Sequence, residues 1–223
     1  MDYEKLPNFL KNMNSVVEDD LEGISWLHGN PPDYTLVNNL YLSERTKIHP
    51  PHSLEAIITN LIKNWEKELS HKTDVSQWRT VDTGKFRVSM NGGEFKGLGD
   101  VAKIGAYNFF IGESEYYAAS LVPDPTESHQ VFRKAMKNGF ALEVLEVYTP
   151  PPKVVFKWRH WGRMEGEVQC PMRNKTIRTM KPTGGKVELI GTTVMVLNDK
   201  YEIEQMEFFF RPDTMLEQMA GVC

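Results

Sequence analysis

A histidine in the C-terminal third of the chain lies in an alternating stretch that is rich in aromatic residues. If this stretch is a strand, Phe156, Trp158 and His160 share one face, and the charged Lys157 and Arg159 lie on the other. A histidine among aromatic side chains can exchange a proton near neutral pH. We therefore predict that His160 faces a cavity as an acid–base group. The alternative is a hydrogen-bonded histidine that only holds strands together.

A carboxylate on the last predicted strand is the expected partner of this histidine. Glu207 stands between Met206 and Phe208, and desolvation by such neighbours would raise its pKa and suit it to acid or base chemistry. The predicted catalytic pair is therefore His160 and Glu207. In the alternative, Glu207 faces solvent, and Met206, Phe208 and Phe210 form the core or a dimer face.

Further candidates for ligand contacts lie on two predicted helices. Near the end of the first, Glu68 precedes His71 by three residues and could orient its imidazole, although a helix C-terminus also favours a histidine for electrostatic reasons. On the second, the Tyr107 hydroxyl could bind a ligand carbonyl, or it could be a tethered group of the core. The predicted ligand-binding set is Trp65, His71, Tyr107, Asn108, Phe156 and Trp158.

The elements that must position these residues change character near Phe140. Before it, apolar residues recur at spacings of three and four, which predicts helices; after it, they alternate, which predicts strands. The chain is therefore expected to be α+β, with a cone-shaped, curved antiparallel sheet of at least four strands and the helices 53–71 and 98–110 across its concave face. The predicted strands are 140–148, 154–163, 187–197 and 201–210, and a long basic connector is expected at 165–183.

The first fifty residues are polar and rich in turns, and the run Gly29-Asn30-Pro31-Pro32 interrupts any helix there. Only residues 33–45 are expected to form a short helix. We predict that residues 1–50 are an extension packed on a single domain, 51–223, because they contain too few apolar residues for a core of their own.

Composition excludes several classes of function. The net charge of −4 offers no general attraction to nucleic acid, and no apolar run approaches the roughly 18 residues of a membrane helix. Two cysteines and a start without a basic-then-apolar signal segment predict a cytoplasmic protein. The six histidines lack the spacing of metal ligands, and no phosphate-binding or dinucleotide-binding glycine motif is present, so we expect neither a metal nor a cofactor.

The order of several short motifs resembles two related groups. The C-terminal pieces Gly162 and Gly166, Pro182-Thr183-Gly184, Val187-Glu188 and Leu216-Glu217-Gln218 resemble the SnoaL-like polyketide cyclases of the nuclear transport factor 2-like superfamily. Blocks along nearly the whole chain resemble the pathogen-related proteins: Trp26-x-His28-Gly29-x-Pro31-Pro32-x-Tyr34, Arg45-Thr46-Lys47, Glu68-Leu69-Ser70-His71-Lys72-Thr73, Tyr107-Asn108, Ser128-His129-x-x-Phe132-Arg133 and Arg159-His160-Trp161-Gly162. The resemblance implies a curved sheet with helices across its mouth. Arg211 departs from the aspartate that is usual in the cyclases.

Three classes of function remain. The first is a cofactor-free isomerase, cyclase or dehydratase acting on a small apolar or polyketide-like metabolite. The others are a carrier for such a metabolite and an interaction protein with a filled pocket. An enzyme requires a cavity of roughly 300 Å³ or more with two convergent polar groups, whereas a carrier requires an apolar one. A homodimer through the outer sheet face is also expected, since that face would carry Phe208, Phe210 and Trp161.

Overall fold

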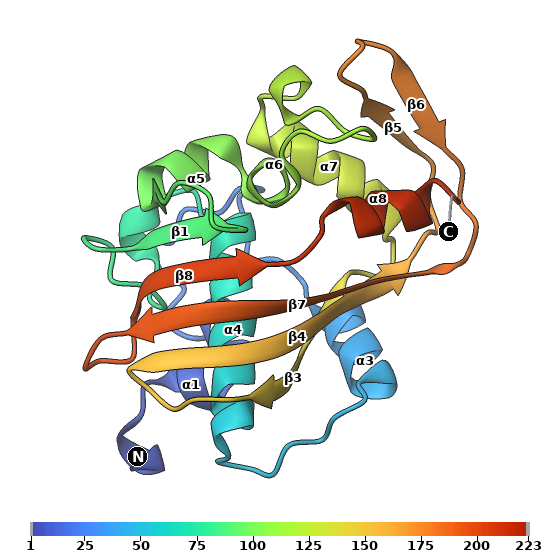
Figure 1. Ribbon diagram of the computed structural model, residues 1–223. Coiled ribbons are helices and arrows are strands. Elements are labelled where there is room, and N and C mark those ends of the chain that lie inside the picture. The colour runs from blue at the N-terminus through green and yellow to red at the C-terminus, as the bar shows by residue number, and fades with distance from the viewer. Residues whose placement is uncertain (1, 222–223) are drawn as a thin grey trace.

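One curved sheet contains all the strands that carry the predicted site. In the computed structural model, which describes residues 2–221, its order is β2-β1-β8-β7-β4-β3 (Figure 1). Neighbouring strands are antiparallel except β1 and β8, which run parallel. The strands are β1 (Arg87–Met90), β2 (Lys96–Gly97), β3 (Ala141–Val147), β4 (Lys153–Arg163), β7 (Lys186–Leu197) and β8 (Ile203–Phe209).

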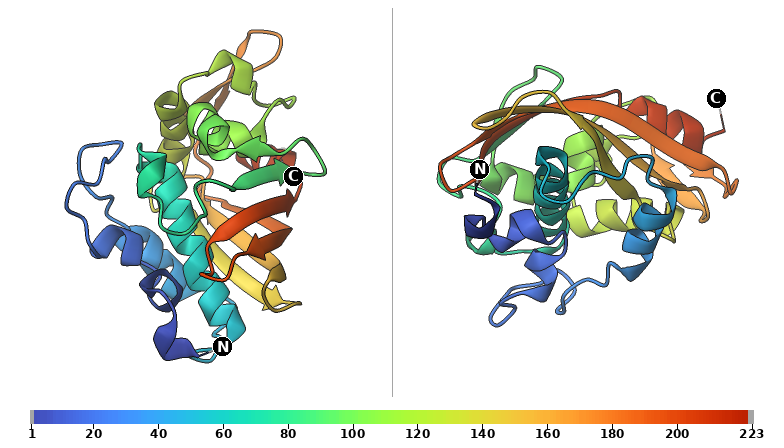
Figure 2. Two further views of the ribbon diagram at one scale, coloured as in Figure 1. Left: turned by 90° about the vertical axis from the view of Figure 1, so that its left-hand side faces the viewer. Right: turned by 90° about the horizontal axis from the view of Figure 1, so that it is seen from below.

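The helices gather under the concave side of this sheet, as the view from below shows (Figure 2). The longest is α4 (Leu54–His71), which begins where the Ser53 hydroxyl accepts a hydrogen bond from Ala56 N, and whose apolar stripe packs toward the sheet. The others on this side are α5 (Leu98–Ile104), α6 (Ala106–Ile111), α7 (Pro125–Ala135) and α8 (Asp213–Met219). The predicted α+β class, with a curved sheet and helices over its concave face, is confirmed.

Two predicted segments differ in detail. The helix expected over 98–110 is broken at Gly105, whose φ of +83° suits glycine and where an added Cβ would lie 2.8 Å from Cβ of Pro125. This close approach brings α7 against the start of α6. The connector expected at 165–183 contains a separate hairpin, β5 (Val168–Pro171) and β6 (Ile177–Met180), which extends beyond the main sheet (Figure 1).

The N-terminal residues pack along α4 through α1 (Asn8–Lys11) and α2 (Ser15–Glu18). The buried amide of Asn64 connects all of these segments: its Oδ1 accepts from Val16 N at 3.2 Å, and its Nδ2 donates to the carbonyls of Phe9 and Asn12 at 3.0 and 2.7 Å. Leu10 and Val16 are fully buried. A domain boundary at residue 50 stays a prediction.

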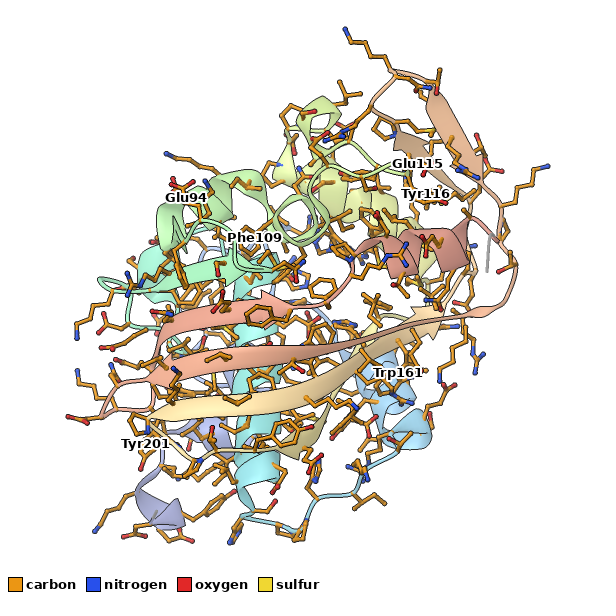
Figure 3. The ribbon with its side chains drawn as sticks, in the orientation of Figure 1. Glu94, Phe109, Glu115, Tyr116, Trp161 and Tyr201 are labelled. Atoms are coloured by element: carbon orange, nitrogen blue, oxygen red, sulfur yellow. The ribbon has the colours of Figure 1, made fainter. Side chains whose placement is uncertain are left out.

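Helix α3 (Thr35–Glu44) covers the β3 edge of the sheet. There Trp161, labelled in Figure 3, is fully buried with Tyr41 and beneath the Arg159 guanidinium, which lies 3.9 Å from the centre of its ring. Phe208 faces the concave side. Phe210 lines the same side, so the expectation that Phe208, Phe210 and Trp161 form an exposed outer face is wrong, and the homodimer stays a prediction without their support. Within residues 2–221, no helix is long and apolar enough to cross a membrane.

Candidate functional site

An inner chamber of about 120 Å³ lies between the concave face of the sheet and helices α4, α6 and α8. Its walls are mainly aromatic and aliphatic, and a chamber of this size holds a ring of roughly benzene dimensions. The lining residues are Ile62, Trp65, Glu66, Leu69, Ser70, Ala106, Tyr107, Phe110, Ile111, Phe140, Leu142, Phe156, Trp158, His160, Leu189, Phe208, Phe210, Pro212 and Met215.

Aromatic contacts fix the walls of the inner chamber. The Trp65 ring from α4 stacks on Phe208 from β8 at 5.7 Å, and Phe110 meets the same Phe208 edge-on at 5.1 Å. The Trp158 indole lies across Gly191 on the neighbouring strand, and its Nε1 donates to Thr193 Oγ1 at 2.9 Å. Such interlocked rings hold a cavity open because each ring is supported from both sides.

The polar feature of the inner chamber is a histidine–carboxylate pair. His160 Nε2 from β4 lies 3.1 Å from Glu66 Oε1 on α4, and the imidazole stacks on Phe140 at 4.1 Å. Burial alone would raise the pKa of Glu66, but His160, with Lys63 and Lys67 behind it, outweighs this effect and holds the pKa below its usual value. Glu66 is therefore ionised at neutral pH.

The ionised partner determines which imidazole nitrogen is free. A carboxylate only accepts hydrogen bonds, so the proton between the two groups resides on Nε2. In the neutral ring, Nδ1 of His160 then carries the lone pair. This atom is buried and has no hydrogen-bond partner among the described residues. His160 therefore lines an apolar chamber, and in its neutral form its tautomer is set by Glu66.

A second cavity, the outer hollow, adjoins the first. It measures about 450 Å³ and is bounded by α7, the end of α4 and the segment 27–37 of the N-terminal extension. Glu66, Ser70, Tyr107 and Phe140 line both cavities, and we call the place where these four residues lie the neck. Backbone pairing holds the extension in place here, with Leu27 N donating to the His71 carbonyl at 2.8 Å. The extension therefore supplies one wall of the site.

One known protein is similar to this chain over most of its length. The protein named "Pathogen-related protein" from Hordeum vulgare is 34% identical over 197 residues, which cover 86% of this chain and 80% of the relative. The chain belongs to the pathogen-related protein family. No family model matches the chain.

The similar solved structures have low sequence identity to this pathogen-related protein. One, described as a SnoaL-like polyketide cyclase from Jannaschia sp. CCS1, is 13% identical with a TM-score of 0.39, covering 78% of this chain and 97% of its own. Another, with a ketosteroid isomerase-like fold from Catenulispora acidiphila, is 9% identical with a TM-score of 0.36, covering 71% and 91%.

Five of the residues singled out from the sequence line the inner chamber: Trp65, Tyr107, Phe156, Trp158 and His160. Glu207 does not, and its predicted position is wrong. Strand β8 turns Phe208 toward the chamber, so alternation places Glu207 on the opposite face, where it is half-buried. The predicted pair of His160 with Glu207 is therefore replaced by His160 with Glu66.

Two other predictions are corrected by hydrogen bonding. Asn108 is outside both cavities: its Nδ2 donates to the Val122 carbonyl at 2.7 Å, and its Oδ1 accepts from Tyr117 Oη at 2.7 Å. Glu68 does not orient His71; it pairs with Lys72 at 2.7 Å inside the protein. His71 instead lines the outer hollow, next to Tyr34 and His129.

Sequence reasoning missed Glu66, although a signal for it exists. The residue lies four positions after Ile62 and three before Leu69, inside the apolar stripe of α4. A carboxylate on the buried face of a helix requires a partner, and this requirement applies to Glu66 as it does to Glu68. The partner, His160, is 94 residues away and could not be identified from local pattern.

Proposed function

We propose that this pathogen-related protein is a cofactor-independent enzyme that moves a proton within a small apolar, ring-sized molecule, as in an isomerisation, cyclisation or dehydration. The observation that carries the proposal is the half-buried His160–Glu66 pair, which lines an aromatic chamber with its imidazole and its carboxylate 3.1 Å apart. His160 acts as the base, and Glu66 orients the ring and stabilises the imidazolium that forms.

Size supports a small substrate. The inner chamber is below the roughly 300 Å³ expected for an ordinary enzyme pocket, but the adjoining hollow supplies further volume, and Glu66, Ser70 and Tyr107 place polar groups at the neck. A substrate ring that fills the chamber would displace water from its aromatic walls, and this strengthens electrostatic interactions between His160 and a developing enolate.

The test uses cyclohex-3-enone, whose ring matches the chamber. His160 would remove a proton from C2, giving a dienolate and an imidazolium, and return it to C4, giving cyclohex-2-enone, which is followed by its ultraviolet absorbance. We expect His160→Gln to slow the reaction by about 100-fold or more and Glu66→Gln by about tenfold, in line with the contributions of general bases. Glu207→Gln is the matched control, because it removes the same charge outside the chamber.

If Glu66→Gln and Glu207→Gln slow the isomerisation equally, the assignment of His160 and Glu66 as the functional pair is wrong. The mostly apolar lining also suits a carrier. Binding of the ketone without turnover, with His160→Gln binding it as tightly as the wild type, would establish that second function instead.

A further inference from the structure

The outer hollow brings together basic side chains from three segments. His129 and Arg133 lie one helical turn apart on α7, and Lys137 follows just beyond its end. The His129 ring lies 5.5 Å from that of His71 on α4 and 5.7 Å from that of Tyr107 on α6. His28 lines the same hollow from the N-terminal extension.

Two of these basic side chains, Arg133 and Lys137, have no ion-pair partner within residues 2–221. The two carboxylates that line the hollow keep their negative charge, but their hydrogen bonds are made to other groups. Asp33 accepts a hydrogen bond from Thr35 N at 2.8 Å at the start of α3, and Glu66 pairs with His160.

Two half-buried histidines of the hollow have lowered pKa values, and burial is the main cause. Burial lowers the pKa of His71 to about 3 and that of His129 to about 4, and in both the nearby cations, including Arg133 and His28, act in the same direction. Both rings are therefore neutral at pH 7, and each presents one N–H donor. Arg133 and Lys137 supply the positive charge.

We propose that the outer hollow binds the carboxylate of a ligand whose apolar ring occupies the inner chamber, so that the ligand class is a small aryl- or alicyclic-alkanoic acid. This inference rests on the proposed function, because it takes the inner chamber as the site of the ring. The neck formed by Tyr107 and Phe140 lets a short chain join the two parts. Since Glu66 is anionic at that neck, the carboxylate lies toward Arg133 on the α7 side.

The test compares 3-phenylpropanoate with its uncharged analogue 3-phenylpropanamide by isothermal titration calorimetry on the full chain. We expect the acid to bind about tenfold or more tightly than the amide, which corresponds to one charge-assisted contact. Arg133→Gln should remove this preference while leaving the affinity for the amide within about twofold. Lys134→Gln, an exposed neighbour on α7 that does not line the hollow, should retain it.

The inference would be overturned if the acid and the amide bind with equal affinity, or if the acid does not bind at millimolar concentration. It would also be overturned if Arg133→Gln and Lys134→Gln lose the preference for the acid to the same extent. Because Arg133 is exposed, its variant should fold, and the melting temperature of each variant verifies this. A preference for the acid without turnover of cyclohex-3-enone supports the anion site and refutes the proposed enzyme. Turnover of that uncharged ketone, with no preference for the acid, supports the proposed enzyme and overturns the anion site.

Discussion

Gly191 gives the Trp158 indole room to lie flat on the sheet, and replacing it tests how the chamber is built. A Cβ at position 191 would lie 2.7 Å from Cε2 and from Cη2 of that indole, and closer still to Cζ2. Carbon atoms need about 3.5 Å, so the ring must move by about 1 Å or more. The side chain stands on the concave face, and the movement pushes it into the chamber.

The Gly191→Ala substitution should lower the free energy of unfolding in two ways. Moving the indole takes its Nε1 from 2.9 Å to beyond hydrogen-bond reach of Thr193, a loss of about 1 kcal/mol. Crowding a packed core adds about 1–3 kcal/mol. Gly191→Ala should therefore lower the free energy of unfolding by about 2–4 kcal/mol, and the melting temperature by roughly 5–15 °C for a chain of this size.

Urea denaturation and the cyclohex-3-enone assay together test this reasoning. Gly99→Ala is the control, because nothing lies within 4 Å of its added Cβ and alanine is favourable in α5. Trp158→Phe should relieve the crowding, so that Gly191→Ala costs less in its presence than alone. Equal stability of the Gly191→Ala and Gly99→Ala variants, or strict additivity with Trp158→Phe, would refute the argument. Turnover should fall at least tenfold in Gly191→Ala, because the ring of the substrate no longer fits beside the indole.

Three further predictions concern stability. Burial lowers the pKa of Lys63 from 10.5 to about 7. Lys63→Met should therefore stabilise the protein at pH 7 by at most about 5 kcal/mol, and by less as the pH rises toward 10. Urea titrations at pH 7 and pH 10 measure this difference. His71 and His129 take up protons more readily in the unfolded chain than in the native one, so the free energy of unfolding should fall as the pH drops from about 6.5 toward 4. In the double variant His71→Gln, His129→Gln, the melting temperature should fall less steeply over this range. A chain that begins at Ser53 should melt well below the full chain in calorimetry, and an unchanged melting temperature would show that the extension contributes nothing.

The sheet and the main helices could be predicted because their apolar residues recur at two distinct periods on either side of Phe140. Alternation also placed Phe156, Trp158 and His160 on one face. The same rule gave the wrong face for Glu207, since a strand with Met206, Phe208 and Phe210 on one side and charged or polar residues on the other has its aromatic side buried.

Contacts between distant segments could not be predicted. The partner of His160 is on a helix, and a helical pattern indicates which face is buried but not which strand it meets. The roles of Asn108 and His71 likewise depend on the loops that surround them: a carbonyl at Val122 engages the amide, and the extension closes over the imidazole. The hairpin at 168–180 was hidden because its basic residues resemble those of a solvated loop.

The parallel pairing of β1 with β8 has a consequence for how the chain is made. Strand β1 (87–90) is synthesised long before β8 (203–209), so one of its edges has no partner until β8 emerges. The residues that line the chamber likewise extend along the chain from Ile62 to Met215. During synthesis, the first half of the chain therefore remains with an unpaired strand edge and exposed aromatic residues, a state that invites chaperone binding or aggregation. Translation that stops after β7 would leave two open edges where β8 belongs. A chain cut short before α8 should therefore lack a complete chamber, because Met215 of α8 forms part of its wall.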